Sequence, residues 1–109
     1  GGLGMTPEAQ RIAIAEVCPN LWQDKSFIWS NQGFLVHPFD EVTIDPLSDL
    51  NAMHEAENHI QDWPKYVLNV MKVIKWKFHE TLADIGVIMS ATASQRAEAF
   101  LRTLGKWID

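Results

Sequence analysis

The clearest periodicity of apolar and polar positions lies near the end of the chain. Apolar side chains recur there at intervals of three and four residues, as on one face of a helix, at Ala93, Ala97, Phe100, Leu101 and Leu104. Glu98 and Arg102 stand four residues apart on the opposite face, in the order that favours an ion pair. The pattern predicts a helix over residues 92–104 with one buried face.

Both ends of this predicted helix are marked in the sequence. Thr92 and Gln95 have the spacing of a capping box, in which the hydroxyl accepts a first-turn N–H and the amide reaches back to the cap. Gly105 supplies the left-handed position at which many helices end. The apolar and partly β-branched run over residues 85–91 predicts a strand that leads into the helix.

Three more helices are predicted from their starts: two begin with a capping side chain beside a proline, which is typical of helix starts, and the third follows an Asp-Trp-Pro break. These starts lie at residues 6–7, 45–46 and 62–64. We expect the first helix to reach about Cys18, the second to run over residues 47–60, and the third to end near Trp76. Each carries apolar positions at helical spacing, so each should bury one face.

The segment between the first two helices changes to aromatic and β-branched residues. Residues 26–29 and 34–39 predict the two strands of a hairpin, with Gly33 at a positive φ in the turn. Pro38 is expected at a strand end or a sheet edge, because proline cannot donate to a β-ladder. Residues 40–43 are interpreted as a polar connection to the second helix.

Length and composition fit one globular domain. The chain has 109 residues, of which 47% are hydrophobic and 21% are charged. Residues 1–4, before Met5, look like a tag remnant, so we predict a single domain over residues 5–109. The formal net charge of −5 argues against a general basic surface for nucleic acid or anionic membranes. No apolar run approaches the ~20 residues that span a bilayer, and no secretion signal is visible, so we expect a cytoplasmic protein without a membrane partner.

Cys18 is the only cysteine in the sequence. It can therefore form neither an intramolecular disulfide nor a cysteine-cluster zinc site. No histidine or basic residue stands nearby in the sequence to lower its pKa. We interpret Cys18 as a buried small hydrophobe rather than a reactive thiol.

Three stretches of the chain resemble small proteins of bacteriophages and prophages. Residues 5–18, 49–57 and 91–107, about a third of the chain together, are similar to the phage ABA-sandwich domain proteins, and the last stretch is the most specific. The resemblance implies a small α+β sandwich of about four helices flanking a short antiparallel sheet. It also implies phage origin and the cytoplasm of a bacterial host. It implies no catalytic residue, because the family brings no established activity and a fold alone supplies no mechanism.

His54, Glu55 and His59 form the most metal-like group in the sequence. The two histidines are five residues apart, about 140° round a helix, whereas the zinc-protease motif places them four apart on one face. Two side chains four residues apart, Glu55 with His59 or His54 with Asn58, could supply two metal ligands. Two ligands do not make a metal site without others from elsewhere in the chain. We therefore expect a solvated polar face and predict no catalytic, cofactor-binding or metal-ligating residue.

Two clusters of charged residues are also interpreted as structural or solvent-exposed groups rather than as binding sites. Carboxylates gather at Asp40, Glu41, Asp45 and Asp49, and lysines gather at Lys65, Lys72, Lys75 and Lys77. The carboxylates lack the order of a calcium loop, and helix capping explains Asp45 and Asp49. The lysines are interleaved with aromatic residues, as in single-strand nucleic-acid binders, but a solvated helix face fits an acidic protein better.

Five tryptophans are more than a domain of this size needs to fill its core. Tryptophan is favoured at binding hot spots because it combines a large rigid surface with an N–H donor. Trp22 and Trp29 lie in or beside the predicted hairpin and Trp107 lies at the end of the chain, so these three are the ones we expect to be partly exposed. For each of them singly, core packing is favoured over contact with a partner, but we expect at least one to take part in binding. Together with His54, they are the candidate partner-binding residues.

Four functions remain open, and nucleic-acid binding through the lysine cluster ranks last among them. The first is a phage or prophage accessory protein that binds a host or phage protein, or a second copy of itself, for example to counter a host defence system. The second is a protein that sequesters a nucleotide or signalling metabolite through polar groups and aromatic stacking. The third is a metal-dependent hydrolase that uses the His54, Glu55 and His59 face. Small size, acidic charge, surplus tryptophan and missing catalytic motifs favour protein binding without catalysis.

Overall fold

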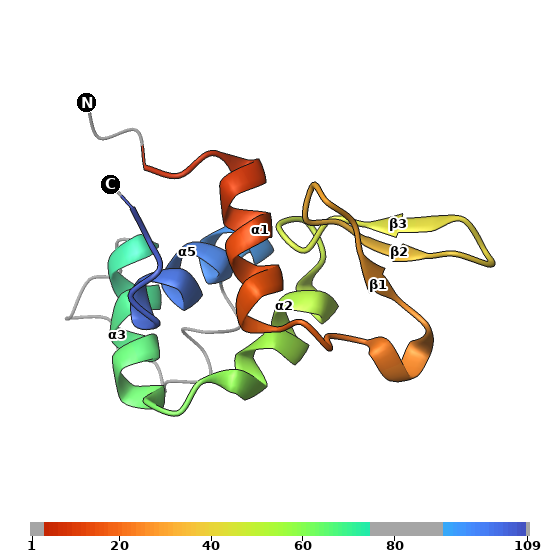
Figure 1. The fold of residues 1–109 in the computed structure, drawn as a ribbon. Helices are drawn as coiled ribbons and strands as arrows, with labels where there is room; N and C mark the ends of the chain where they lie inside the picture. Colours follow the sequence, from red (N-terminus) through yellow and green to blue (C-terminus); the bar gives the residue numbers. More distant parts are fainter. Residues whose placement is uncertain (1–3, 75–90, 109) are drawn as a thin grey trace.

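The computed structural model describes residues 4–74 and 91–108. Its elements, in chain order, are α1 (Pro7–Val17), the 3-10 helix η1 (Gln23–Lys25), β1 (Ile28–Trp29), β2 (Leu35–His37), β3 (Val42–Ile44), α2 (Leu50–Ala56), the 3-10 helix η2 (Glu57–His59), α3 (Trp63–Val73) and α5 (Ala93–Thr103). The strands form an antiparallel sheet in the order β1-β2-β3 (Figure 1). Within these two ranges, four α-helices and a short antiparallel sheet confirm the α+β class. Over these residues, no helix is long and apolar enough to cross a membrane.

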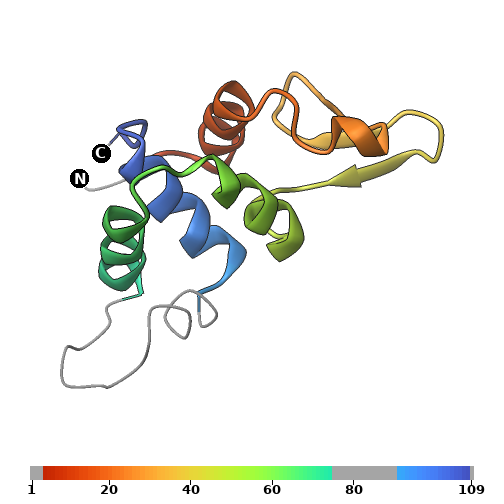
Figure 2. The same cartoon turned by 90° about the horizontal axis from the view of Figure 1, so that it is seen from below.

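The helices form one body in which α5 is the central element. α5 packs against α1, α2 and α3 and lies between its neighbours in both views (Figures 1 and 2). Its predicted apolar face is buried, and burial extends round the helix to Ala99 and Thr103. The Thr103 hydroxyl donates to the Ala99 carbonyl at 2.7 Å and accepts from the Asn69 amide at 3.0 Å, which links α5 to α3. The predicted Glu98–Arg102 pair is present at 2.8 Å.

Three of the four predicted helix starts, and the predicted end of the last helix, are confirmed. Thr92 and Gln95 form the capping box, with N–H···O distances of 3.1 Å and 2.8 Å in the two directions. Gly105 follows α5 with a φ of 71°. Thr6 and Asp62 accept first-turn N–H groups of α1 and α3.

The predicted start of the second helix is wrong. The Asp45 carboxylate accepts the Leu47 N–H at 2.9 Å and closes a turn, and α2 begins only after Asp49, whose carboxylate accepts the Ala52 N–H at 3.0 Å. Both aspartates are competent caps, so the local signal is ambiguous. Pro46 and Leu47 are buried in this turn, which holds the chain there, so Asp49 rather than Asp45 caps α2. After α2 the chain forms η2, where we expected one continuous helix.

The polar connection expected over residues 40–43 is also wrong, because this stretch enters β3. The strand pairs with β2 in the register Leu35↔Ile44, Val36↔Thr43 and His37↔Val42. Its three residues are all β-branched, which favours extended backbone. The reversal is confined to residues 38–41, where Glu41 adopts a positive φ of 55°.

The hairpin predicted within residues 26–39 is confirmed. β1 pairs with β2, Gly33 has a φ of 83°, and Pro38 directly follows β2. A Cβ at Gly33 would lie 2.7 Å from the backbone carbonyl carbon of Arg11. Glycine is therefore required both by the turn conformation and by the close approach of the turn to α1.

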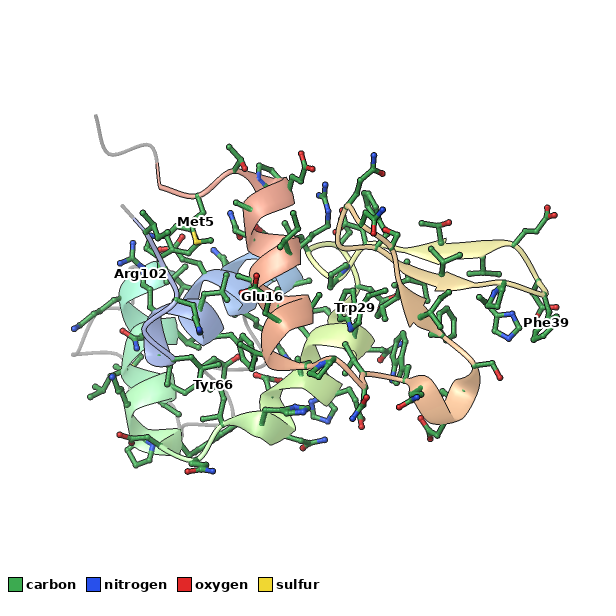
Figure 3. All side chains as sticks on the ribbon, viewed as in Figure 1. Met5, Glu16, Trp29, Phe39, Tyr66 and Arg102 are labelled. Atoms are coloured by element: carbon green, nitrogen blue, oxygen red, sulfur yellow. The ribbon has the colours of Figure 1, made fainter. Side chains whose placement is uncertain are left out.

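Residues 26–44, which we call the arm, extend away from the helical body in both views (Figures 1 and 2). Leu35, on the central strand, is fully buried, whereas the Phe39 side chain is 83% exposed. Figure 3 shows Phe39 at the far end of the arm. The arm is thus anchored at one end and exposed at the other.

Some predicted features lie outside the described residues. They are the strand over residues 85–90, the part of the third helix beyond Ile74, and Lys75, Trp76 and Lys77. Cys18 is described, and it is fully buried as predicted. Burial raises the pKa of its thiol to about 12.

Candidate functional site

One face of the arm carries a continuous set of apolar and aromatic side chains. Successive side chains of a strand point to opposite faces, so the pairing register determines which residues share a side. This inner face carries Phe27 and Trp29, Leu35 and His37, and Val42 and Ile44. Its body end is fixed, because Leu35 is buried and the Trp29 indole N–H donates to the Cys18 carbonyl at 2.8 Å.

An aromatic row runs along the inner face towards the tip. The ring centroids of Trp22 and Phe27 are 5.5 Å apart, those of Phe27 and His37 are 5.4 Å apart, and those of His37 and Phe39 are 6.0 Å apart. The two contacts of His37 are edge-to-face, a favoured arrangement for aromatic pairs. Val42, beside the row, is 43% exposed. The row therefore leads from the base of the arm to an apolar tip in solvent.

The base of the row opens into a groove of about 490 Å³ between η1, the sheet and α2, which we call the arm groove. It is lined by Trp22, Lys25, Phe27, Ile44, Asp49, Asn51, His54 and Glu55. Trp22 and Ser26 flank η1 with positive φ values of 55° and 69°, an uncommon conformation for residues other than glycine. The Lys25 ammonium lies 5.1 Å from the Trp22 ring centroid. One side of the groove is aromatic and apolar, and the other is polar and contains two carboxylates, those of Asp49 and Glu55.

The formal negative charge of the protein is concentrated in the segment of the sequence that carries the arm and most of this groove. Residues 22–55 contain six carboxylates and one lysine, a formal charge of −5, which equals that of the whole chain. The remaining residues hold eight carboxylates and eight basic side chains and are formally neutral. This acidic segment contributes Asp49 and Glu55 to the groove, Asp40 and Glu41 to the turn at the arm tip, and Asp45, which lies 4.0 Å from the Arg11 guanidinium.

The structure brings only two of the four candidate partner-binding residues together. Trp22 and His54 line the arm groove. Trp29 instead lines a separate, mostly apolar groove of about 400 Å³ between α1 and β1. Trp107 lies beyond α5, where its ring centroid is 5.0 Å from the Arg102 guanidinium carbon. All three tryptophans are partly exposed, as predicted, and Trp63, which we did not single out, is 40% exposed.

The metal-like group of α2 and η2 does not converge. The His54 side chain is 80% exposed, and its Nδ1 lies 3.5 Å from the Glu57 carboxylate. Glu55 lines the arm groove, whereas His59 lies outside it with its Nδ1 3.3 Å from the Ala56 carbonyl. Across residues 4–74 and 91–108, no group of three histidine, cysteine or acidic side chains is placed to hold a metal ion.

A buried polar triad in the helical body escaped the sequence reasoning. The Tyr66 hydroxyl donates to the Glu57 carboxylate, and the Arg96 guanidinium donates to the other carboxylate oxygen at 3.3 Å. Burial, with the hydrogen bond and charge of Glu57, raises the pKa of Tyr66 far above its usual range. The triad joins η2, α3 and α5, and Figure 3 shows Tyr66 inside the body, far from the arm tip. Its position indicates a structural role.

No family model, curated protein or solved structure matches the chain. The resemblance to phage ABA-sandwich proteins therefore stays a prediction. The site has to be interpreted from its own geometry.

Proposed function

We propose that this chain is an accessory protein of phage or prophage origin that acts by binding another protein in the host cytoplasm, without catalysis. The sequence resemblance supports the origin and the compartment. The arm supports the binding function. Countering a host defence system is one task that such binding can serve.

The observation that carries the proposal is the exposed apolar surface of the arm. Phe39 and Val42, 83% and 43% exposed, lie at the tip of the arm and beside the aromatic row, and Ile28, 57% exposed, lies on the opposite face of the same arm. Single exposed apolar residues are ordinary, but several on one protruding element are typical of protein contact sites. A large aromatic side chain at such a tip resembles the anchors that dominate binding energy in interfaces.

The experiment is site-specific photo-cross-linking in living host cells. A photoreactive phenylalanine analogue replaces Phe39 in one variant and Leu68, 51% exposed on α3, in the control. We expect discrete cross-linked products with the probe at position 39 and none with the probe at position 68. Equal products at both positions, or none at position 39, would overturn the proposal. A product with twice the mass of the chain would identify the partner as a second copy.

The second candidate is a protein that sequesters a small molecule. It is favoured by the arm groove, whose volume lies within the range of ligand sites and whose wall combines Trp22 with polar groups. A ligand in this groove raises the melting temperature as its concentration passes the dissociation constant. A panel of nucleotides that shifts the melting temperature of the native protein, but not of Trp22→Ala, would favour this function over protein binding. No shift with any nucleotide would remove its main support.

A further inference from the structure

We infer that the arm groove binds a basic linear segment of the partner protein, with a lysine or arginine beside Asp49 and Glu55 and an apolar side chain on the inner face of the arm. This inference rests on the proposed function and specifies the chemistry of its partner. The groove and the aromatic row are continuous, since Phe27 belongs to both. A segment lying in the groove can therefore extend along the row towards the tip.

The apolar half of the groove supplies contact area. Phe27 and Ile44 come from the inner face, and Val42 continues it beyond the groove with 43% of its surface exposed. Burial of such side chains stabilises a complex without specifying the charge of the partner. The Trp22 and Phe27 rings also provide faces on which an aliphatic stem or a guanidinium plane can pack.

The polar half of the groove specifies the charge. Asp49, Asn51 and Glu55 present carbonyl and carboxylate oxygens, which accept hydrogen bonds from ammonium and guanidinium groups. Lys25 is the one lysine or arginine among the lining residues, and it already lies over the Trp22 ring. Asp49 and Glu55 outnumber Lys25 among the lining residues, and the surrounding segment from 22 to 55 is acidic, so approach of a basic segment is electrostatically favoured.

The same charge argues against pairing of two arms. A two-fold contact between arm grooves would place Asp49 and Glu55 of one copy near the same carboxylates of the other. Like charges at an interface suppress association. A second copy seated on this face is therefore disfavoured, and a positively charged partner is the occupant that the surface fits.

The test is selection of short random peptides displayed on a particle surface against the purified full-length protein. We expect the bound peptides to be enriched in lysine or arginine next to apolar residues. Binding of a selected peptide should weaken by about tenfold or more in Glu55→Lys, because the variant places a cation where the peptide cation lies. The control Glu8→Lys makes the same change of net charge in the exposed first turn of α1 and should alter affinity far less.

A second pair of variants tests the apolar half. Val42→Ser should weaken the same peptide, whereas Leu68→Ser, at a similarly exposed site on α3, should not. Equal effects of Glu55→Lys and Glu8→Lys would mean attraction by net charge alone and would overturn the inference. Enrichment of acidic or neutral peptides, or no enrichment, would overturn it as well. If cross-linking at position 39 persists in those cases, the proposed function stands and only the groove is refuted.

Discussion

The Tyr66 hydroxyl donates a hydrogen bond to the Glu57 carboxylate inside the helical body, and its removal tests the buried triad directly. Tyr66 is fully buried and Glu57 is 4% exposed, so water cannot replace the lost donor without opening the body. Tyr66→Phe keeps the ring and removes only the donor. Hydrogen bonds to charged groups contribute about 1.5–3 kcal/mol, so we expect a loss of about 2 kcal/mol in the free energy of unfolding. For a domain of about this length, that corresponds to a fall of roughly 10 °C in the melting temperature.

Urea denaturation followed by tryptophan fluorescence measures this loss. The midpoint should fall while the slope of the free energy against urea stays unchanged, because the surface exposed on unfolding is nearly the same. Thr43→Val removes a hydroxyl from an exposed position of β3 and should stay within about 0.5 kcal/mol of the native protein. A loss below about 0.5 kcal/mol in Tyr66→Phe would refute the reasoning, since the carboxylate would then not depend on this donor.

The same tyrosine predicts a dependence on alkaline pH. Its pKa is raised from the model-compound value of 10.0 by burial, reinforced by the hydrogen bond and charge of Glu57. The folded state therefore keeps a proton that the unfolded state releases near pH 10. Its contribution to stability is fully present below pH 10 and declines as pH rises above 10. Because Tyr66 is the only tyrosine, tyrosinate absorbance reports it alone. Tyrosinate that forms near pH 10 while the protein stays folded would contradict the buried placement.

Three further predictions concern the local structure. Cys18 should react with a thiol reagent only after denaturant is added, because burial raises its pKa to about 12; rapid reaction of the native protein would disprove its burial. Thr92→Ala should lower the free energy of unfolding by about 1 kcal/mol in urea denaturation, and Ser94→Ala, exposed in the same first turn, should not. Gly33→Ala should cost more than about 1 kcal/mol and more than Gly105→Ala, since both have a positive φ but only Gly33 approaches other residues. Equal losses at the two glycines would show that the turn does not pack against α1.

The parts of the fold that the sequence predicted are those decided by local interactions. The cap of α5 depends on Thr92 and Gln95, three residues apart, and its end depends on Gly105. The hairpin turn depends on a glycine at a positive φ. Cys18, which the sequence placed on the apolar face of the first helix, is buried as the residue that caps the end of α1. The caps and the turn are decided by residues that are neighbours in the chain, so they can be predicted from the sequence alone.

The sequence alone cannot decide between two neighbouring residues that are equally suited to cap a helix. Asp45 and Asp49 are both good helix caps, and the sequence alone favoured the one followed by proline. Burial of Leu47 decided otherwise. The β-branched run Val42–Ile44 is short and follows two acidic residues, so the sequence did not predict a strand there. It forms β3 because it pairs with β2.

The site depended on tertiary structure more than the fold did. Trp22 and His54 could be nominated from residue type, but their meeting in one groove requires η1, the sheet and α2 to lie together. Glu57 falls on the apolar stripe of the predicted second helix, which was the one local sign of its burial. Its partners Tyr66 and Arg96 are nine and 39 residues away in sequence.

The sequence by itself determined which helices form around their caps, where the hairpin turns, that Cys18 is buried, and that residues 22–55 carry the formal net charge. Only the tertiary structure decided that Asp49 and Glu55 line an aromatic groove, that the arm extends into solvent, and that Glu57 is paired with Arg96 inside the body. The reason is the distance along the sequence between the residues that interact. Caps and turns are hydrogen bonds across a few residues, whereas grooves and buried ion pairs arise from segments that meet only after the chain has folded.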